Sequence, residues 1–348
     1  MYELYDYIKF LVVLSLGFLA SLASMPIVIK KMKSLGIVGD DVHKKNQPPV
    51  PEMGGIGVLI GLLISVFAAS ILFPEKVLVL TSFLATTLIA GFVGALDDLK
   101  TLSPKVKPFL TLFAGLPIFV LGTYNPHLTL PIIGQTRLTI IYPFMIPIAI
   151  AVTSNAVNMM DPFNGVMSGT CSIVTLVLLI SAAFLQHTDA IIMYSGLLGS
   201  LVAFYYFNKY PAKTFSGDVG SLSIGAAIGA AAIIVPTGGQ PSRLEIIAVV
   251  AFMPQIMNAF YGLSTIGRLY ERREVPRPVH LLEDGRLMAS DDEKAPITLA
   301  RMILARGPLT EKEAAHLFHG LSIISGVLAL FTMSVSYTHL TLPTKRIV

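Results

Sequence analysis

The sequence N-A-V-N-M-M-D-P-F-N-G at residues 155–165 separates two apolar runs, at 139–153 and 168–186. It gathers three asparagines and an aspartate in a chain in which only 13% of residues are charged. Polar groups at the end of a membrane span cost free energy unless they bind something. The stretch therefore predicts a functional site at the surface of a chain embedded in a membrane.

Composition supports the membrane interpretation, because 54% of the 348 residues are hydrophobic and the mean hydropathy is +0.73. Apolar runs of about 20 residues are long enough to cross a bilayer as helices. We predict an all-α, polytopic membrane protein with one catalytic domain at residues 1–335 and a tail at 336–348 that is foreign to the rest of the chain and receives no function. The ten predicted spans lie at 10–29, 55–73, 77–96, 106–122, 139–153, 168–186, 189–207, 221–236, 244–266 and 317–335.

The distribution of basic residues predicts the orientation of these spans. The connections at 30–54, 97–105, 154–167, 208–220 and 267–316, with Lys107 at the edge of the next span, contain 19 of the 25 Lys and Arg residues. Basic residues accumulate in cytoplasmic loops. We therefore expect these loops, including the long loop at 267–316, to be cytoplasmic and both termini to lie outside. In a membrane protein this distribution matters more than the net charge of +4, which therefore does not indicate a nucleic-acid partner.

Asp97 and Asp98 end an otherwise apolar span, and Lys107 follows nine residues after Asp98. Adjacent residues on a helix point about 100° apart, so both acids can face one metal only if the helix has ended. A solvated helix cap is the simpler interpretation. Acids at a helix C-terminus are opposed by the helix dipole, which favours a functional role.

Asn155, Asn158, Asp161 and Asn164 recur every three residues, but Pro162 and Gly165 predict a helix end followed by a turn. A capping and turn cluster is the alternative interpretation. Carboxamides also suit Mg²⁺ ligation or hydrogen bonding to a base or sugar.

Asp218 lies between two glycines in F-S-G-D-V-G-S-L, just before a span. Alone, this pattern is common at helix N-termini, which favour anions. Beside the other acidic clusters, Asp218 is a candidate Mg²⁺ ligand.

The last long loop begins R-L-Y-E-R-R-E-V-P-R-P-V-H, which contains Arg272, Arg273, Arg277 and His280. These cations suit either an anchor on anionic lipid or a clamp for a diphosphate. Near the N-terminus, Lys44, Glu52 and a glycine turn precede the second span, but they lack the full pattern of a phosphate-binding loop.

Together, D-D at residue 97, N-A-V-N-M-M-D-P-F-N-G and F-S-G-D-V-G-S-L resemble the polyprenyl-phosphate N-acetylhexosamine-1-phosphate transferase family, from about Lys30 to Leu330. Bacterial members carry H-H-H or H-I-H in the last loop, where this chain has P-R-P-V-H. The chain looks more like the eukaryotic and archaeal branch that uses UDP-N-acetylglucosamine and dolichyl phosphate to prime N-glycosylation. The eukaryotic pattern there is P-R-H-R, whose first Arg matches Arg277.

The resemblance implies an integral membrane enzyme of the cell membrane or endoplasmic reticulum that releases UMP, with Mg²⁺, or Mn²⁺ in its place, as cofactor. A homodimer is compatible with it. Direct attack of the lipid phosphate and a route through an aspartyl-phosphate both remain open. The resemblance implies metal binding by Asn158 and Asp218, and proton removal or positioning by Asp97 with Asp98 beside the metal. It implies phosphate contacts from Lys107, Arg277 and His280, hydrogen bonds to the nucleotide sugar from Glu52 and Asn164, and support from Asn155. Lys44 is a further candidate for substrate binding.

Two alternatives remain at this stage. The same chemistry could use another UDP-N-acetylhexosamine for cell-wall glycan synthesis. From a different class, a transporter would also have ten spans and polar clusters, but its ionisable residues are expected near mid-membrane, and here they lie at span ends.

Overall fold

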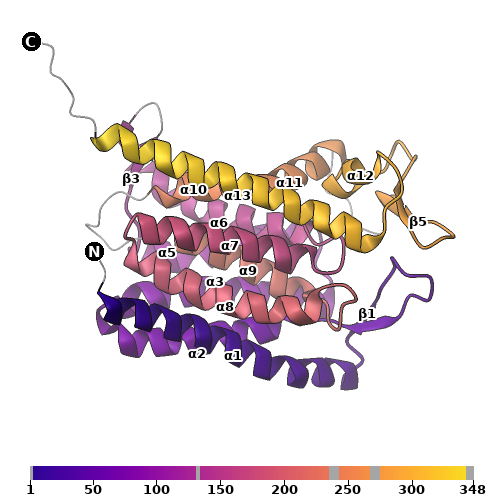
Figure 1. Ribbon diagram of the computed structural model, residues 1–348, viewed down its shortest axis with the longest axis horizontal. Helices are drawn as coiled ribbons and strands as arrows, with labels where there is room; N and C mark the ends of the chain where they lie inside the picture. Colours follow the sequence, from indigo (N-terminus) through magenta and orange to yellow (C-terminus); the bar gives the residue numbers. More distant parts are fainter. Residues whose placement is uncertain (1–2, 131–133, 235–242, 267–274, 342–348) are drawn as a thin grey trace, which may run out of the picture.

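The computed structural model describes residues 3–130, 134–234, 243–266 and 275–341, and within these ranges the chain is mostly helical (Figure 1). The helices are α1 (Leu4–Ser34), α2 (Gly55–Leu72), α3 (Val77–Lys100), α4 (Val106–Leu112), α5 (Leu116–Val120), α6 (Ile141–Met159), α7 (Val166–Phe184), α8 (Thr188–Asn208), α9 (Gly217–Ile233), α10 (Leu244–Ala251), α11 (Met253–Ile266), α12 (Leu299–Leu304) and α13 (Glu311–Thr341), with short 3₁₀ turns at Pro74–Lys76 and Phe113–Gly115.

Three antiparallel hairpins, which the all-α prediction did not include, lie in the connections of the described chain. They pair β1 (Val38–Asp40) with β2 (Pro49–Pro51), β3 (His127–Leu130) with β4 (Gly134–Arg137), and β5 (Val279–Leu281) with β6 (Leu287–Ala289). Each strand has only three or four residues, so the hairpins are small additions to a mainly helical fold.

Within the described residues, seven helices are long and apolar enough to cross a membrane, or eight if the bent pair α10–α11 forms one span. The axes of α10 and α11 differ by 61°. Two further apolar helical stretches, Val106–Val120 and Gly217–Ile233, are shorter. Within the described residues, each of the ten predicted apolar segments overlaps helical structure. The long apolar helices make the chain an integral membrane protein. The fourth segment is broken into α4 and α5, where Pro117 opens the second piece.

The long helices lie side by side along the long axis of the molecule (Figure 1). The hairpin beginning with β1, the hairpin beginning with β5, and α12 gather at one end, on the right of the view, whereas β3 lies at the other end. The connections that are rich in Lys and Arg in the sequence therefore include those at the right-hand end.

Helix α9 forms the centre of the bundle, because every residue from Val219 to Ile233 is buried. Its sequence is mostly Gly, Ala and Ser, and small residues let neighbouring helix backbones approach closely. A Cβ atom at Gly94 of α3 would overlap the backbone of Asp218, and one at Gly55 of α2 would overlap Gly220. These close crossings bring the ends of α2, α3 and α9 together.

The chain ends in a long α13, which begins at Glu311 and runs to Thr341, beyond the predicted span at 317–335. Residues 342–348 of the predicted foreign tail lie outside the described residues.

Candidate active site

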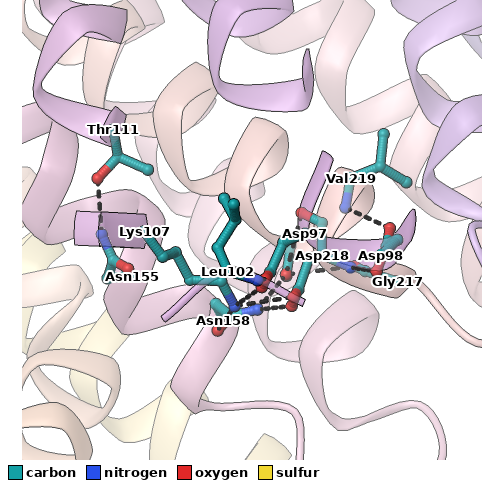
Figure 2. Close-up of polar contacts among 11 residues, drawn as sticks. Asp97, Asp98, Leu102, Lys107, Thr111, Asn155, Asn158, Gly217, Asp218 and Val219 are labelled. Carbon is teal, nitrogen blue, oxygen red and sulfur yellow. Dashed lines mark hydrogen bonds and ion pairs between the residues drawn. The ribbon is translucent and has the colours of Figure 1, made fainter. Parts of the chain in front are cut away.

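The Lys107 ammonium group is the centre of a polar cluster formed by four helices (Figure 2). Its Nζ atom lies 2.6 Å from Asp97 Oδ2 and 2.8 Å from Asp218 Oδ2, and it donates to Asn158 Oδ1 at 3.3 Å. These oxygens come from α3, α9 and α6, and Lys107 belongs to the first turn of α4. Two carboxylates and a carboxamide thus converge on one positive charge.

The turn between α3 and α4 places Asp97 and Lys107 on facing sides of this cluster. Thr101 adopts a positive φ of 45°, and its N–H donates to the Asp97 carbonyl at 2.8 Å, which ends α3. The next residue, Leu102, donates its backbone N–H to Asp97 Oδ1. Asp97 is only 8% exposed, so its position is fixed by the backbone of the turn that leads to Lys107.

The two asparagines of α6 have different partners. Asn158 Nδ2 donates to Ser221 Oγ at 2.8 Å and also to Asp218 Oδ1, which leaves Asn158 Oδ1 facing the Lys107 ammonium. One turn earlier, Asn155 Nδ2 donates to Thr111 Oγ1 at 2.9 Å and to the carbonyl of Ala151. Asn158 is therefore part of the cluster, whereas Asn155 ties α6 to α4 behind it.

Asp98 points away from Lys107 and towards the N-terminus of α9. Its two carboxylate oxygens accept from the backbone N–H groups of Asp218 at 2.7 Å and Val219 at 2.9 Å. Because α3 continues to Lys100, the two adjacent acids diverge. A carboxylate at a helix N-terminus satisfies unpaired N–H groups and is favoured by the helix dipole. Asp98 thus holds the first turn of α9, which carries Asp218.

A second polar cluster surrounds Asn164, which is 6% exposed. Asn164 Nδ2 donates to Asp41 Oδ2 at 3.1 Å and to Glu311 Oε1, and Asn164 Oδ1 accepts from the Ala212 backbone N–H at 3.2 Å. Lys44 pairs with Asp41, and its Nζ lies 5.0 Å from the centre of the Tyr210 ring. Asn164 therefore joins the β1–β2 loop, the α8–α9 connection and the start of α13.

The predicted turn at Pro162 and Gly165 is confirmed. Helix α6 ends at Met159, α7 begins at Val166, and Gly165 between them has a φ of +79°. The Asp161 side chain accepts from Ser216 Oγ, so the turn contacts the residue that precedes α9.

The remaining predicted residues lie in two of the connections. Glu52 is half-buried, and its backbone N–H donates to Ile37. Arg277 is exposed, and His280 is exposed on β5, opposite Met288 of β6. The described contacts do not join Arg277 or His280 to the Lys107 cluster. Arg272 and Arg273 lie outside the described residues.

Known proteins resemble the chain along most of its length. Residues 80–236 match the sequence profile of glycosyl transferase family 4. A protein of Saccharolobus solfataricus named as a UDP-N-acetylglucosamine–dolichyl-phosphate N-acetylglucosaminephosphotransferase is 30% identical, over 89% of this chain and 92% of its own. A similarly named protein of Sulfolobus acidocaldarius is 28% identical, over 92% and 95% of the two chains. A phospho-N-acetylmuramoyl-pentapeptide-transferase of Caldicellulosiruptor bescii is 33% identical, over 70% and 80%.

The chain belongs to glycosyl transferase family 4. It is therefore an enzyme, a phosphotransferase, and the transporter interpretation is discarded. The resemblance stated from the sequence is confirmed by these matches.

The side-chain oxygen atoms around Lys107 in this family 4 transferase are of the kind that binds a magnesium ion. Among the described residues, no three His, Cys, Asp or Glu side chains are grouped so that they could hold a metal. The three oxygen atoms that contact Lys107 Nζ belong to two carboxylates and one carboxamide. Mg²⁺ takes oxygen ligands and usually only one or two protein carboxylates, with water and substrate phosphates completing its shell. The residues present therefore fit such an ion bound together with a phosphate substrate.

Some residues that the structure places in the two polar clusters were missed by the sequence interpretation. Asp41 gave a weak signal, because it lies three residues before Lys44 in a polar loop. Glu311 gave none, because an acid at the start of a helix is usually only favourable to the dipole. Ser221 lies one turn after Asp218 inside an apolar helix, where serine is ordinary.

Proposed function

We propose that the enzyme transfers N-acetylglucosamine-1-phosphate from UDP-N-acetylglucosamine to a polyprenyl phosphate such as dolichyl phosphate and releases UMP. The observation that carries this proposal is the convergence of Asp97, Asp218 and Asn158 on the Lys107 ammonium at adjoining helix ends. A site at the end of membrane helices can be reached both by a water-soluble nucleotide sugar and by a lipid phosphate. The archaeal relatives carry the name of this reaction.

Charge balance supports a divalent cation in the reaction. With Asp98 included, three carboxylates gather near one ammonium, so the ionised cluster has two more negative charges than positive ones. A diphosphate and a phosphate monoester would be repelled by this excess. We propose that Asp218 and Asn158 hold Mg²⁺, which when bound neutralises charge on the transferring phosphoryl group. Mn²⁺ is expected to substitute.

The chain's own residues then bind and orient the two phosphates. Lys107 is in place to contact a phosphate oxygen while it remains paired with Asp97. We propose that Asp97 accepts the last proton of the lipid phosphate or positions it. Because the second pKa of a phosphate monoester is about 6, this group is largely ionised at neutral pH, and positioning is the larger contribution.

The transfer step balances as a displacement at phosphorus. An oxygen of the lipid phosphate forms a bond to the β-phosphorus of the donor, and the bond from that phosphorus to the bridging oxygen breaks, so that UMP leaves with the oxygen. In a two-step route, a carboxylate of the cluster would be the first nucleophile and would transfer the sugar phosphate to the lipid afterwards.

We further propose that all ten helical segments cross the membrane and that the active site is cytoplasmic, with both termini outside. This orientation is supported by the Lys and Arg distribution. Figure 1 is consistent with it, because the β1 and β5 hairpins, which belong to basic connections, lie at the same end of the bundle.

The test is an assay of nucleotide release by the purified protein with Mg²⁺, dolichyl or undecaprenyl phosphate, and a panel of UDP-sugars. UMP and a lipid-linked diphosphate sugar are the expected products with UDP-N-acetylglucosamine. Release of UDP in place of UMP would reject phosphosugar transfer. Turnover only with UDP-N-acetylmuramoyl-pentapeptide would instead assign the reaction named for the Caldicellulosiruptor bescii relative.

A further inference from the structure

Glu311, the first residue of α13, contacts Asn164 through one carboxylate oxygen. Glu311 Oε1 accepts from the Asn164 backbone N–H at 2.9 Å and also from Asn164 Nδ2. We propose that Glu311 is a positioning residue of the donor site, which holds the Asn164 side chain in a single amide orientation. This inference rests on the proposed function, together with the contact to the nucleotide sugar that the resemblance implies for Asn164.

The burial of Glu311 is costly, and helix α13 does not need it as a cap. The residue is 4% exposed, and within the described part of the chain its second oxygen, Oε2, has no hydrogen-bond partner. A buried and incompletely satisfied carboxylate costs free energy. The start of α13 is already capped, because Glu313 accepts from the Thr310 N–H at 2.8 Å and Thr310 Oγ1 accepts from the Glu313 N–H. The contact with Asn164 is therefore the role that we assign to Glu311.

The contact determines what Asn164 can offer to a ligand. Both N–H groups of its amide are used by carboxylates, those of Asp41 and Glu311, and Oδ1 accepts from Ala212. The one remaining hydrogen-bonding capacity is the second lone pair of Oδ1. Held in this way, Asn164 meets the donor as an acceptor, and it selects an N–H or O–H group of the nucleotide sugar over a phosphate oxygen. Without Glu311 the backbone N–H and one amide N–H of Asn164 lose their partner, the amide is held only by Asp41 and Ala212, and this selectivity is weakened.

The same contact also links α13 to the segments that lead into the catalytic cluster. Ala212 belongs to the α8–α9 connection, six residues before Asp218. Asp41 belongs to the β1–β2 loop, which also carries Lys44. Through Asn164, Glu311 therefore fixes both the donor contact and two loops beside the site.

Steady-state kinetics test this role in two Glu311 variants, one control variant, Asn164→Ala and a double variant. The Michaelis constants for donor and lipid are measured separately. Glu311→Leu is expected to raise the KM for UDP-N-acetylglucosamine about ten-fold or more, with kcat and the KM for the lipid phosphate changed by less than about two-fold. Glu311→Gln keeps an accepting oxygen and is expected to stay within about three-fold of wild type. Lys312→Leu, in the same turn but exposed and outside the cap formed by Thr310 and Glu313, is the matched control and should not change the donor KM.

The double variant decides whether Glu311 acts through Asn164. In an Asn164→Ala background, Glu311→Leu should cause no further rise in the donor KM. Multiplicative effects, or equal rises in both Michaelis constants, would overturn the positioning role while leaving the proposed function intact. If the wild-type enzyme releases no UMP, the proposed function fails, and the donor role of Glu311 fails with it.

A second measurement does not depend on turnover. Because the Asn164 backbone N–H donates to Glu311, hydrogen exchange of the peptide at 160–166 should accelerate in Glu311→Leu and not in Lys312→Leu. Exchange that is unchanged in both variants would overturn the link between Glu311 and Asn164.

Discussion

The Asp98 carboxylate accepts from the backbone N–H of Asp218 at 2.7 Å, so one acid of the site holds the backbone of another. A second hydrogen bond, from the Val219 N–H at 2.9 Å, makes Asp98 the cap of α9. The position of Asp218 relative to Lys107 therefore depends on a residue of α3 that does not itself contact Lys107 in the described structure.

The first prediction concerns this cap. Asp98→Asn leaves one accepting oxygen and turns an amide group towards a backbone N–H, so it should lower the free energy of unfolding by about 1–2 kcal/mol. Activity should fall at least about ten-fold, because Asp218 is displaced. Thermal melting and UMP release measure the two effects. Asp291→Asn, on an exposed residue, is the control and should change neither. A wild-type melting temperature in Asp98→Asn would show that the cap is unimportant.

The sequence predicted much of this site, because polar residues at the ends of apolar runs are conspicuous. Asp97, Lys107, Asn158 and Asp218 were all chosen on that ground, and the structure places them in one cluster. The separate directions of Asp97 and Asp98 followed from helix geometry once α3 was seen to continue to Lys100.

The partners of Asn164 could not be predicted in the same way. Its contacts with Asp41 and Glu311 join residues that are 123 and 147 positions apart. No local pattern reports such a separation, since it depends on how α13 packs against the turn after α6. The hairpins were missed for a different reason, because strands of three or four residues give too little alternation to be detected.

The second prediction concerns Lys107 and the metal. Lys107→Met removes the positive charge between Asp97 and Asp218, so the protein should lose activity by about 100-fold or more and bind Mn²⁺ at least about ten-fold more tightly. Electron paramagnetic resonance of free Mn²⁺ measures binding without turnover.

Two further variants make the metal prediction specific. Asp218→Ala and Asn158→Ala should weaken Mn²⁺ binding and abolish Mg²⁺-dependent activity in a protein that still folds. Lys105→Met, an exposed lysine in the same connection, should bind Mn²⁺ as the wild type does. Unchanged Mn²⁺ affinity in Asp218→Ala would remove that residue from the proposed metal site.

The third prediction concerns the charge of the Asn164 cluster. Asn164→Asp places a carboxylate oxygen where Nδ2 now donates to Asp41 and Glu311, so three buried acids would face one another. The unfolding free energy should fall by about 3 kcal/mol, because an uncompensated buried charge is costly. Adding Glu311→Gln should restore part of the loss by supplying an amide donor. Asn46→Asp, in the exposed part of the β1–β2 loop, serves as the control for the charge change. Equal melting temperatures for Asn164→Asp and Asn46→Asp would contradict this explanation.

The last prediction concerns the close crossing that brings α3 and α9 together. A Cβ atom at Gly94 would overlap the carbonyl oxygen and the carbonyl carbon of Asp218. The backbone cannot move aside as a flexible side chain can. Gly94→Ala should therefore separate the two helices at the site, with a loss of about 2 kcal/mol in unfolding free energy and a large loss of activity.

Gly320→Ala is the matched control for this crossing, because Gly320 also lies in a helix but has no atom within 4 Å of its hypothetical Cβ. Alanine favours the helix over glycine by about 1 kcal/mol, so this variant should be as stable as the wild type or slightly more stable, with normal UMP release. The two substitutions add the same methyl group to a helix, and their helix propensities change alike. A difference between them therefore measures the crossing itself, whereas equal behaviour would mean that α9 can shift without disturbing Asp218.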